Sequence, residues 1–307
     1  MESDTLRGAV REDHMTNQMR LATPTKAAGI LSLVVFALLS SQAFAQIDLS
    51  GEWAGRVHND APERGGGPEI GDFTGLPINE AARMRAESYN PSLLTLPVWQ
   101  CRPHPADYMG GRAGFNIRFT PEIDPSTQQL IAWHARAAWM AQERTIWMDG
   151  RPHPAEEARH TWQGFSTGKW EGNVLTVTTT HLKMGFLRRN GVVRSDRAVL
   201  TEHFYRHGDM MTVASIVEDP AYLTEPLPRS VSYMLDTAQQ MAPYPCEAVV
   251  EIPREDGVVP HYLPGTNPFL TEFATKHNLP LDAVKGGAET IYPDYQKQSR
   301  GLATAVK

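Results

Sequence analysis

The sequence contains few cysteines and no block of charge of either sign. Its 307 residues include two cysteines, Cys101 and Cys246, and carry a formal net charge of −6 at pH 7. Proteins that bind nucleic acid present a clustered basic face, and no such cluster can be found along this chain. The sequence therefore predicts no nucleic-acid partner.

Motifs for the common organic cofactors are also missing. The chain has no Gly-rich dinucleotide fingerprint, no P-loop and no flavin motif. No internal repeat is present. We therefore expect any chemistry to rely on side chains, with no organic cofactor.

The longest apolar run lies near the N-terminus. Lys26 precedes about fifteen largely apolar residues, and Ala43-Phe44-Ala45 follows before Gln46. A basic flank, a short apolar core and small residues are typical of a secretory signal peptide, and the run is short for a spanning helix. We predict a cleaved signal peptide over residues 1–45 and a periplasmic or secreted protein without stable membrane insertion. An uncleaved membrane anchor is the alternative.

The two cysteines bear on the same question of compartment. In an oxidising compartment, two cysteines most simply form one disulfide bond. A Cys101–Cys246 bond would close a loop of about 145 residues and could stabilise the fold by roughly 4 to 5 kcal/mol in the chain-entropy description. Two buried free thiols are the alternative.

The fold class follows from residues 114–235. Short segments rich in β-branched and aromatic residues alternate there with turn dipeptides such as Asp149-Gly150 and Gly172-Asn173. Seven or eight such strands favour a mainly β fold, a single antiparallel up-and-down barrel similar to lipocalins, over a sandwich. The predicted parts are the signal peptide (1–45), an N-terminal strand, loop and short helix (46–113), the barrel core (114–252) and a C-terminal helical tail packed on the barrel (253–307).

One predicted strand, residues 198–206, carries an ionisable group on each face. Glu202 shares a face with Leu200 and Phe204, whereas His203 lies on the opposite face. A barrel of about eight strands can hold one small ligand, so one of the two side chains would line the lumen. The alternation does not decide which.

Several ordered blocks resemble a family. They are DLSGEW, RTIWMDGRPHP, GFSTGKWEGNVLTVTTTHL, SDRAVLTEHFYR and IVEDPAYLTEP, within about residues 46–230. Together they look like a large group of exported, mostly uncharacterised bacterial proteins with DGRxHP and GxSxGxWEG blocks. The resemblance implies export and no established common reaction. The chain departs from the group's usual pattern at Phe165, where histidine is usual, and at His203, where arginine is usual.

Two specific chemistries are disfavoured by their context. Residues 164–168 spell G-x-S-x-G, but a nucleophile elbow needs a helix after the serine, and a strand is predicted there. His153, His160 and His181 lie on different segments without the spacing of a metal site. We therefore predict no serine hydrolase and no metal centre.

Acid–base chemistry by side chains is the remaining hypothesis. An apolar cavity shifts the pKa values of carboxyl and imidazole groups toward neutrality and so supplies general acids and bases. His153 is the first candidate acid–base residue, with Asp149 orienting it, and Arg151 is suited to bind a carboxylate. The DGRPHP loop is equally well read as a scaffold turn. The candidate catalytic residues are His153, Asp149, Glu202 and His203; the candidate substrate-binding residues are Arg151, His104, Tyr108, His134, Trp147 and Trp162.

The sequence thus predicts an exported enzyme that acts without a cofactor on a hydrophobic, aromatic or carboxylated small molecule. A lyase, isomerase or decarboxylase needs only acid–base groups in an apolar pocket. The alternative is a non-catalytic, lipocalin-like binding protein of the periplasm, and a structural envelope protein is a third hypothesis.

Overall fold

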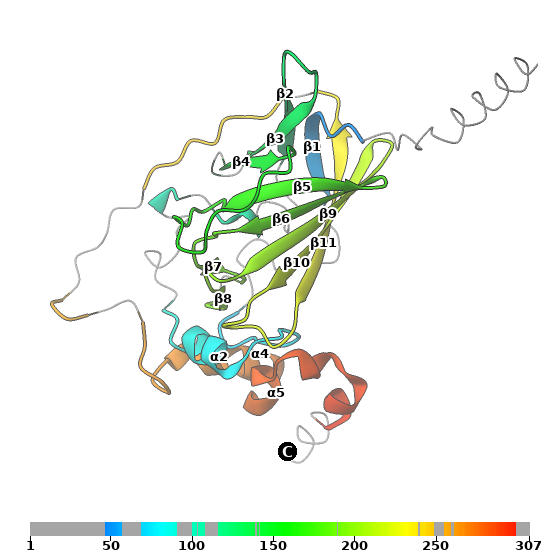
Figure 1. The fold of residues 1–307 in the computed structure, drawn as a ribbon. Helices are drawn as coiled ribbons and strands as arrows, with labels where there is room; N and C mark the ends of the chain where they lie inside the picture. The colour runs from blue at the N-terminus through cyan, green and yellow to red at the C-terminus, as the bar shows by residue number, and fades with distance from the viewer. Residues whose placement is uncertain are drawn as a thin grey trace, which may run out of the picture. The chain divides into compact units, whose positions relative to one another are not determined.

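Nine of the described strands close into a barrel (Figure 1). The computed structural model describes residues 47–56, 69–90, 100–102, 104–107, 116–138, 140, 142–188, 190–238, 240–248, 255–258 and 261–298. The predicted signal peptide and the candidate residue Tyr108 lie outside these residues. The barrel strands are β1 (Gly51–Arg56), β2 (Ile117–Ile123), β3 (Leu130–Ala137), β4 (Gln142–Trp147), β5 (Phe165–Glu171), β6 (Val174–Thr180), β9 (Val199–His207), β10 (Met210–Glu218) and β11 (Leu227–Asp236).

The predicted barrel is therefore confirmed, with a meandering strand order. Around the ring the order is β1-β11-β10-β9-β6-β5-β4-β3-β2, and a small separate hairpin, β7 (Gly185–Phe186) and β8 (Val193–Arg194), lies between β6 and β9 in sequence. Strand β1 pairs with both β2 and β11. The barrel thus takes its first strand from the segment that precedes the predicted core.

One pair of neighbouring strands departs from the expected antiparallel arrangement. Strands β4 and β5 are parallel, with Ile146 opposite Ser166 and Trp147 opposite Thr167. Directions cannot alternate all the way around a ring of nine strands, so at least one pair must be parallel. A parallel connection has to cross back along the sheet and needs a dozen or more residues. Residues 148–164 make this crossover, and Asp149-Gly150 begins it instead of closing a hairpin.

Side chains fill the barrel in three layers. One apolar cluster is built around Trp53, Phe119 and Tyr233, and a second around Leu182, Leu200 and Val217. Between them lies a belt of buried polar side chains from adjacent strands: Arg144, Ser166, Thr179, Glu202 and Ser215.

Short helices gather at one end of the barrel (Figure 1). Asn79 caps α2 by accepting a hydrogen bond from the Ala82 N–H at 3.0 Å, as its position before an Ala-rich run predicts. The C-terminal helices are tied to the segment before α2, because the Phe73 N–H donates to the Val284 carbonyl. The helical elements are α2 (Glu80–Glu87), α4 (Glu272–His277), α5 (Leu281–Lys285) and the 3₁₀ turns Pro268–Thr271 and Ala288–Ile291. None of the helices in the described ranges has the length and apolar character that crossing a membrane requires.

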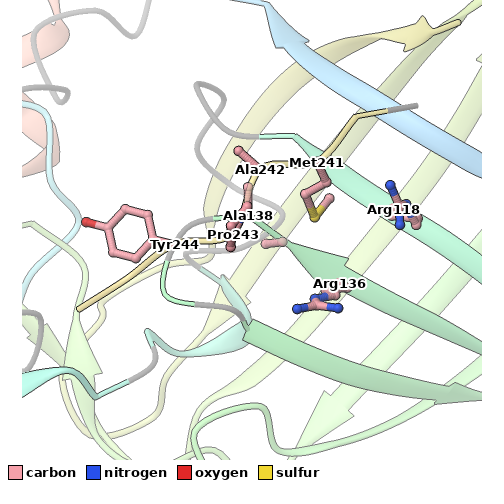
Figure 2. A pocket seen from close by; sticks show the side chains of 8 residues that line it. Arg118, Arg136, Ala138, Met241, Ala242, Pro243 and Tyr244 are labelled. Carbon is pink, nitrogen blue, oxygen red and sulfur yellow. The ribbon is translucent and has the colours of Figure 1, made fainter. Parts of the chain in front are cut away.

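The two cysteines form the predicted disulfide bond. Cys101 and Cys246 are joined, with 5.8 Å between their Cα atoms and a sequence separation of 145. Figure 2 shows residues 241–244, just before Cys246, beside the strands that carry Arg118 and Arg136, with the Tyr244 ring directed away from both arginines. The bond thus fixes this extended segment to the chain that leads into β2.

Candidate ligand-binding site

Among the residues that the structure describes, the barrel interior shows no space that would hold an organic ligand. Its cavity beside Arg144 and Glu202 has a volume of about 10 Å³, which is about the size of one water molecule. Aromatic side chains occupy the remaining space, with Phe119 and Phe204 in edge-to-face contact at 5.9 Å between ring centroids. The expected ligand-holding lumen is therefore a packed core.

Glu202 faces this interior, which settles the orientation of β9. Its side chain is fully buried, and its Oε2 lies 2.5 Å from Arg144 Nη2. The two side chains thus form a buried ion pair. Arg144 in turn donates to Ser166 at 2.9 Å and to Thr179 at 2.5 Å. Ser166 of the G-x-S-x-G run is therefore part of the polar belt.

His203 lies on the outer face of the barrel. Its Nδ1 is 3.1 Å from the Thr176 hydroxyl, which donates to Glu171. Glu202 and His203 thus point to opposite sides of the sheet. The two residues cannot serve one catalytic centre.

His153 is held by two hydroxyl groups on the outer face of β5 and β6. Its Nε2 lies 2.8 Å from Thr167 Oγ1, and its Nδ1 lies 2.8 Å from Thr180 Oγ1. Thr180 Oγ1 is also 2.7 Å from His181 Nδ1, and His181 Nε2 is 2.8 Å from the Ala155 carbonyl oxygen. These contacts join two residues of the crossover, His153 and Ala155, to strands β5 and β6 of the barrel wall.

The positions of the protons along this series of hydrogen bonds follow from its last acceptor, the Ala155 carbonyl oxygen. A carbonyl oxygen can only accept, so His181 Nε2 donates and, in the neutral ring, Nδ1 accepts from Thr180. Thr180 then accepts from His153 Nδ1–H, and His153 Nε2 accepts from Thr167. Burial, together with the nearby His181, lowers the pKa of His153, which agrees with a neutral ring. Both ring nitrogens of His153 are thus engaged by the scaffold.

Asp149 does not orient His153, contrary to the geometry expected from the sequence. Its carboxylate accepts two hydrogen bonds from Arg151 Nε, both at 2.9 Å, and these bonds lower the pKa of Asp149. The Arg151 guanidinium also lies 3.5 Å above the Trp147 ring. Asp149, Arg151 and Trp147 therefore form a local cluster where the crossover begins.

The remaining candidates are dispersed. His104 is buried, and its carbonyl oxygen accepts from Gln163 at 2.6 Å. His134 is exposed on the outside of β3 and lies 2.7 Å from Glu122. Among the described residues, the predicted acid–base groups are thus not brought together, and their catalytic roles remain predictions.

Two surface hollows lined by described residues have room for a small molecule. One, of about 540 Å³, lies on the outer face of β2, β3 and β4 and is polar. Its charged groups already have partners: Arg118 is 2.9 Å from Glu52, and Arg136 is 3.8 Å from Glu143. Because these charged side chains are already in ion pairs, the hollow has few charged groups left to bind a ligand.

The second hollow, the aromatic pocket, has a volume of about 550 Å³. Three large aromatic side chains line it, in addition to the imidazole of His261, and two of them, Tyr89 and Phe186, are in edge-to-face contact with 5.7 Å between ring centroids. The third is Trp162, which the crossover carries; of the predicted substrate-binding residues in the described chain, it is the one that lines this pocket. The full lining is Arg85, Ser88, Tyr89, Trp162, Met184, Gly185, Phe186, Gly191, Val193 and His261.

Local hydrogen bonds position the walls of this pocket. The Thr161 N–H donates to the His181 carbonyl at 2.9 Å, and the Lys183 N–H donates to the Thr161 carbonyl at 2.8 Å, which fixes the chain before Trp162. Gly191 lies against Tyr89, because a Cβ at this position would be 2.5 Å from the Tyr89 Cβ. The histidine chain and the aromatic pocket thus share the crossover segment as a support.

Most of the pocket was not predictable from the sequence. Arg85 and Tyr89 come from the end of α2, Phe186 from β7, and His261 from a segment near the C-terminus. These segments are far apart in sequence and carry no shared motif. Five of the tryptophans fall between residues 133 and 170, and this clustering was the sequence signal that indicated Trp162.

Comparisons with protein-family models, with curated proteins and with solved structures find no match for this chain.

Proposed function

We propose that this protein is an exported protein that binds a hydrophobic, aromatic small molecule in the aromatic pocket. The observation that carries the proposal is the contrast between the two spaces. The aromatic pocket, at about 550 Å³, falls within the roughly 300 to 1,000 Å³ that is usual for ligand sites, whereas the interior cavity holds about 10 Å³. Aromatic walls favour a flat, apolar ligand.

Export is supported by two independent features. The N-terminal segment has the pattern of a secretory signal peptide, and a disulfide bond joins Cys101 to Cys246. The blocks shared with exported bacterial proteins agree with this proposal. Cell fractionation followed by N-terminal sequencing tests it: a mature protein that begins at Gln46 in the periplasm or medium supports export, and an intact N-terminus in the cytoplasm contradicts it.

Ligand binding is tested on the full-length, folded protein, purified under mild conditions. Native mass spectrometry would report a retained organic mass, and tryptophan fluorescence would report binding of added aromatic probes. We expect binding to weaken at least about tenfold in Trp162→Ala, because a buried aromatic contact contributes on the order of 1.4 kcal/mol or more. Trp147→Ala is the matched control, since Trp147 contacts Arg151 and lies outside the pocket lining. Equal binding by both variants would rule out this pocket.

An acid–base enzyme is the second candidate function, because one imidazole, that of His261, lines the pocket beside Arg85. In this case a lyase, isomerase or decarboxylase would use His261, a residue that sequence reasoning missed. Turnover of a probe that His261→Gln abolishes while leaving probe affinity intact would favour the enzyme. Binding without turnover of any bound compound would favour the binding protein.

A further inference from the structure

The charges around the aromatic pocket are of one sign. Arg85 and His261 line it, and no aspartate or glutamate is among the described residues of the lining. A further cation, Lys183, lies with its Nζ 5.1 Å from the centroid of the Trp162 ring. The pocket lining therefore holds one permanent cation, Arg85, together with apolar and aromatic side chains.

The Arg85 guanidinium differs from its neighbours on and around α2. Arg83 Nε lies 3.6 Å from Glu80, and Lys285 Nζ lies 3.1 Å from Glu87. Within the described part of the chain, Arg85 has no carboxylate at ion-pair distance, and the same holds for Lys183. The Arg85 guanidinium in the pocket lining thus remains available to a ligand anion.

We propose that the ligand of the aromatic pocket is an aromatic carboxylate whose ring lies among Tyr89, Trp162 and Phe186 and whose carboxylate pairs with Arg85. This inference rests on the proposed function and specifies its ligand class. Guanidinium groups bind carboxylates in a bidentate geometry through two parallel charge-assisted hydrogen bonds. Lys183 adds positive potential from its place on Trp162.

A single negative charge suits this pocket better than the double charge of a phosphate. Arg85 lies in the last turn of α2, and Ser88 is the C-cap of the helix. The C-terminal end of a helix carries a partial negative charge of about half an electron, which opposes a highly charged anion. Phosphate sites use helix N-termini instead.

Three probes of similar size separate the contributions of ring and charge. The full-length protein is titrated by calorimetry with 2-naphthoate, with its neutral analogue 2-naphthalenemethanol, and with the aliphatic carboxylate decanoate. We expect 2-naphthoate to bind most tightly, and each of the other two to bind at least about tenfold more weakly, because each lacks one of the two interactions.

Two variants then test whether Arg85 is the residue that binds the carboxylate. In Arg85→Gln, binding of 2-naphthoate should weaken about tenfold or more, whereas binding of the neutral alcohol should not change. Lys169→Gln is the matched control, because it removes one positive charge from β5, where Lys169 pairs with Glu171 and lies outside the pocket lining. It should bind all probes as the wild type does. Thermal unfolding monitored by circular dichroism verifies that both variants are folded.

Each of the other outcomes would overturn one defined part of the proposal. Equal affinity for 2-naphthoate and the alcohol, or equal losses of both probes in Arg85→Gln, would overturn the carboxylate while leaving an aromatic ligand. Equal affinity for 2-naphthoate and decanoate would overturn the aromatic part. Failure of all three probes to bind would overturn the proposed function itself, together with this inference.

Discussion

Arg144 and Glu202 form an ion pair inside the barrel, with 2.5 Å between Nη2 and Oε2 and side-chain exposures of 2% and 0%. Desolvation opposes such a pair, and removing one partner leaves the other charge buried alone. We expect Glu202→Leu or Arg144→Met alone to lower the free energy of unfolding by about 3 to 5 kcal/mol. The double variant should recover most of this loss. Urea unfolding of the three variants measures the effect.

A neighbouring residue on β4 provides the control for the buried pair. Glu143 is 72% exposed and lies 3.8 Å from Arg136 on the outside of the barrel. Glu143→Gln should therefore change the free energy of unfolding by less than about 1 kcal/mol. If Glu202→Leu is as mild as Glu143→Gln, the buried pair contributes nothing to stability and our account of the belt is wrong.

The histidine chain predicts a loss of stability in acid. The folded protein lowers the pKa of His153 below its ordinary value of 6.5 through burial and the nearby His181. Between the two pKa values the unfolded chain binds more protons, so the stabilising contribution is present above about pH 6.5 and is lost as the pH falls toward the folded pKa. The urea midpoint should therefore decrease from pH 8 to pH 5, and less so in His153→Asn. His181 and His160, whose rings are 5.2 Å apart, remain in both proteins. Parallel pH profiles for the two proteins would contradict this role.

Alanine substitutions at two glycines, Gly191 and Gly172, test whether Tyr89 forms a wall of the aromatic pocket. A Cβ on Gly191 would lie 2.5 Å from the Tyr89 Cβ and 3.0 Å from the Ala86 carbonyl oxygen, whereas a Cβ on Gly172 would meet nothing within 4 Å. Both glycines have positive φ, so both alanine variants incur a backbone cost of about 1 to 2 kcal/mol. We expect Gly191→Ala to lose affinity for 2-naphthoate in addition, and Gly172→Ala to keep it. Similar affinities in both variants would show that Tyr89 is not a pocket wall.

The disulfide bond should make stability sensitive to reduction. The Cys101–Cys246 bond closes a loop with a sequence separation of 145 residues. In the chain-entropy description, its loss lowers the free energy of unfolding by up to about 5 kcal/mol. Urea unfolding with and without a phosphine reductant measures the difference, and a Cys101→Ser/Cys246→Ser variant, which the reductant should not affect, is the control. Identical midpoints for the oxidised and reduced wild type would contradict the prediction.

Strand alternation made the barrel predictable, but it could not say which face pointed inward. Val199–His207 carries large residues on both faces, and the inward-facing Glu202 is paired with Arg144 on β4, which lies far away in sequence. The turn Asp149-Gly150 was misleading for a related reason. Its local chemistry suits a hairpin, whereas the odd number of strands requires a parallel pair at β4 and β5.

The candidate site was predictable to a lesser degree. Trp162 was identified because tryptophans cluster in that part of the chain. The hydroxyl groups that engage His153 were missed, because Thr167 and Thr180 are brought to it by strand pairing and not by sequence proximity. The contacts of the pocket likewise depend on α2, β7 and residue 261 meeting in three dimensions.

The pairing of β1 with β11 has a consequence for the order of events during synthesis. Glu52 lies opposite Asp236, so the ring cannot close until the chain has been made at least as far as residue 236. Until then β1 and β10 present unpaired edges, which are sites where strands from other chains can add. A chain whose synthesis is incomplete is therefore the form of this protein most exposed to aggregation, and a factor that shields strand edges would act on it at that stage.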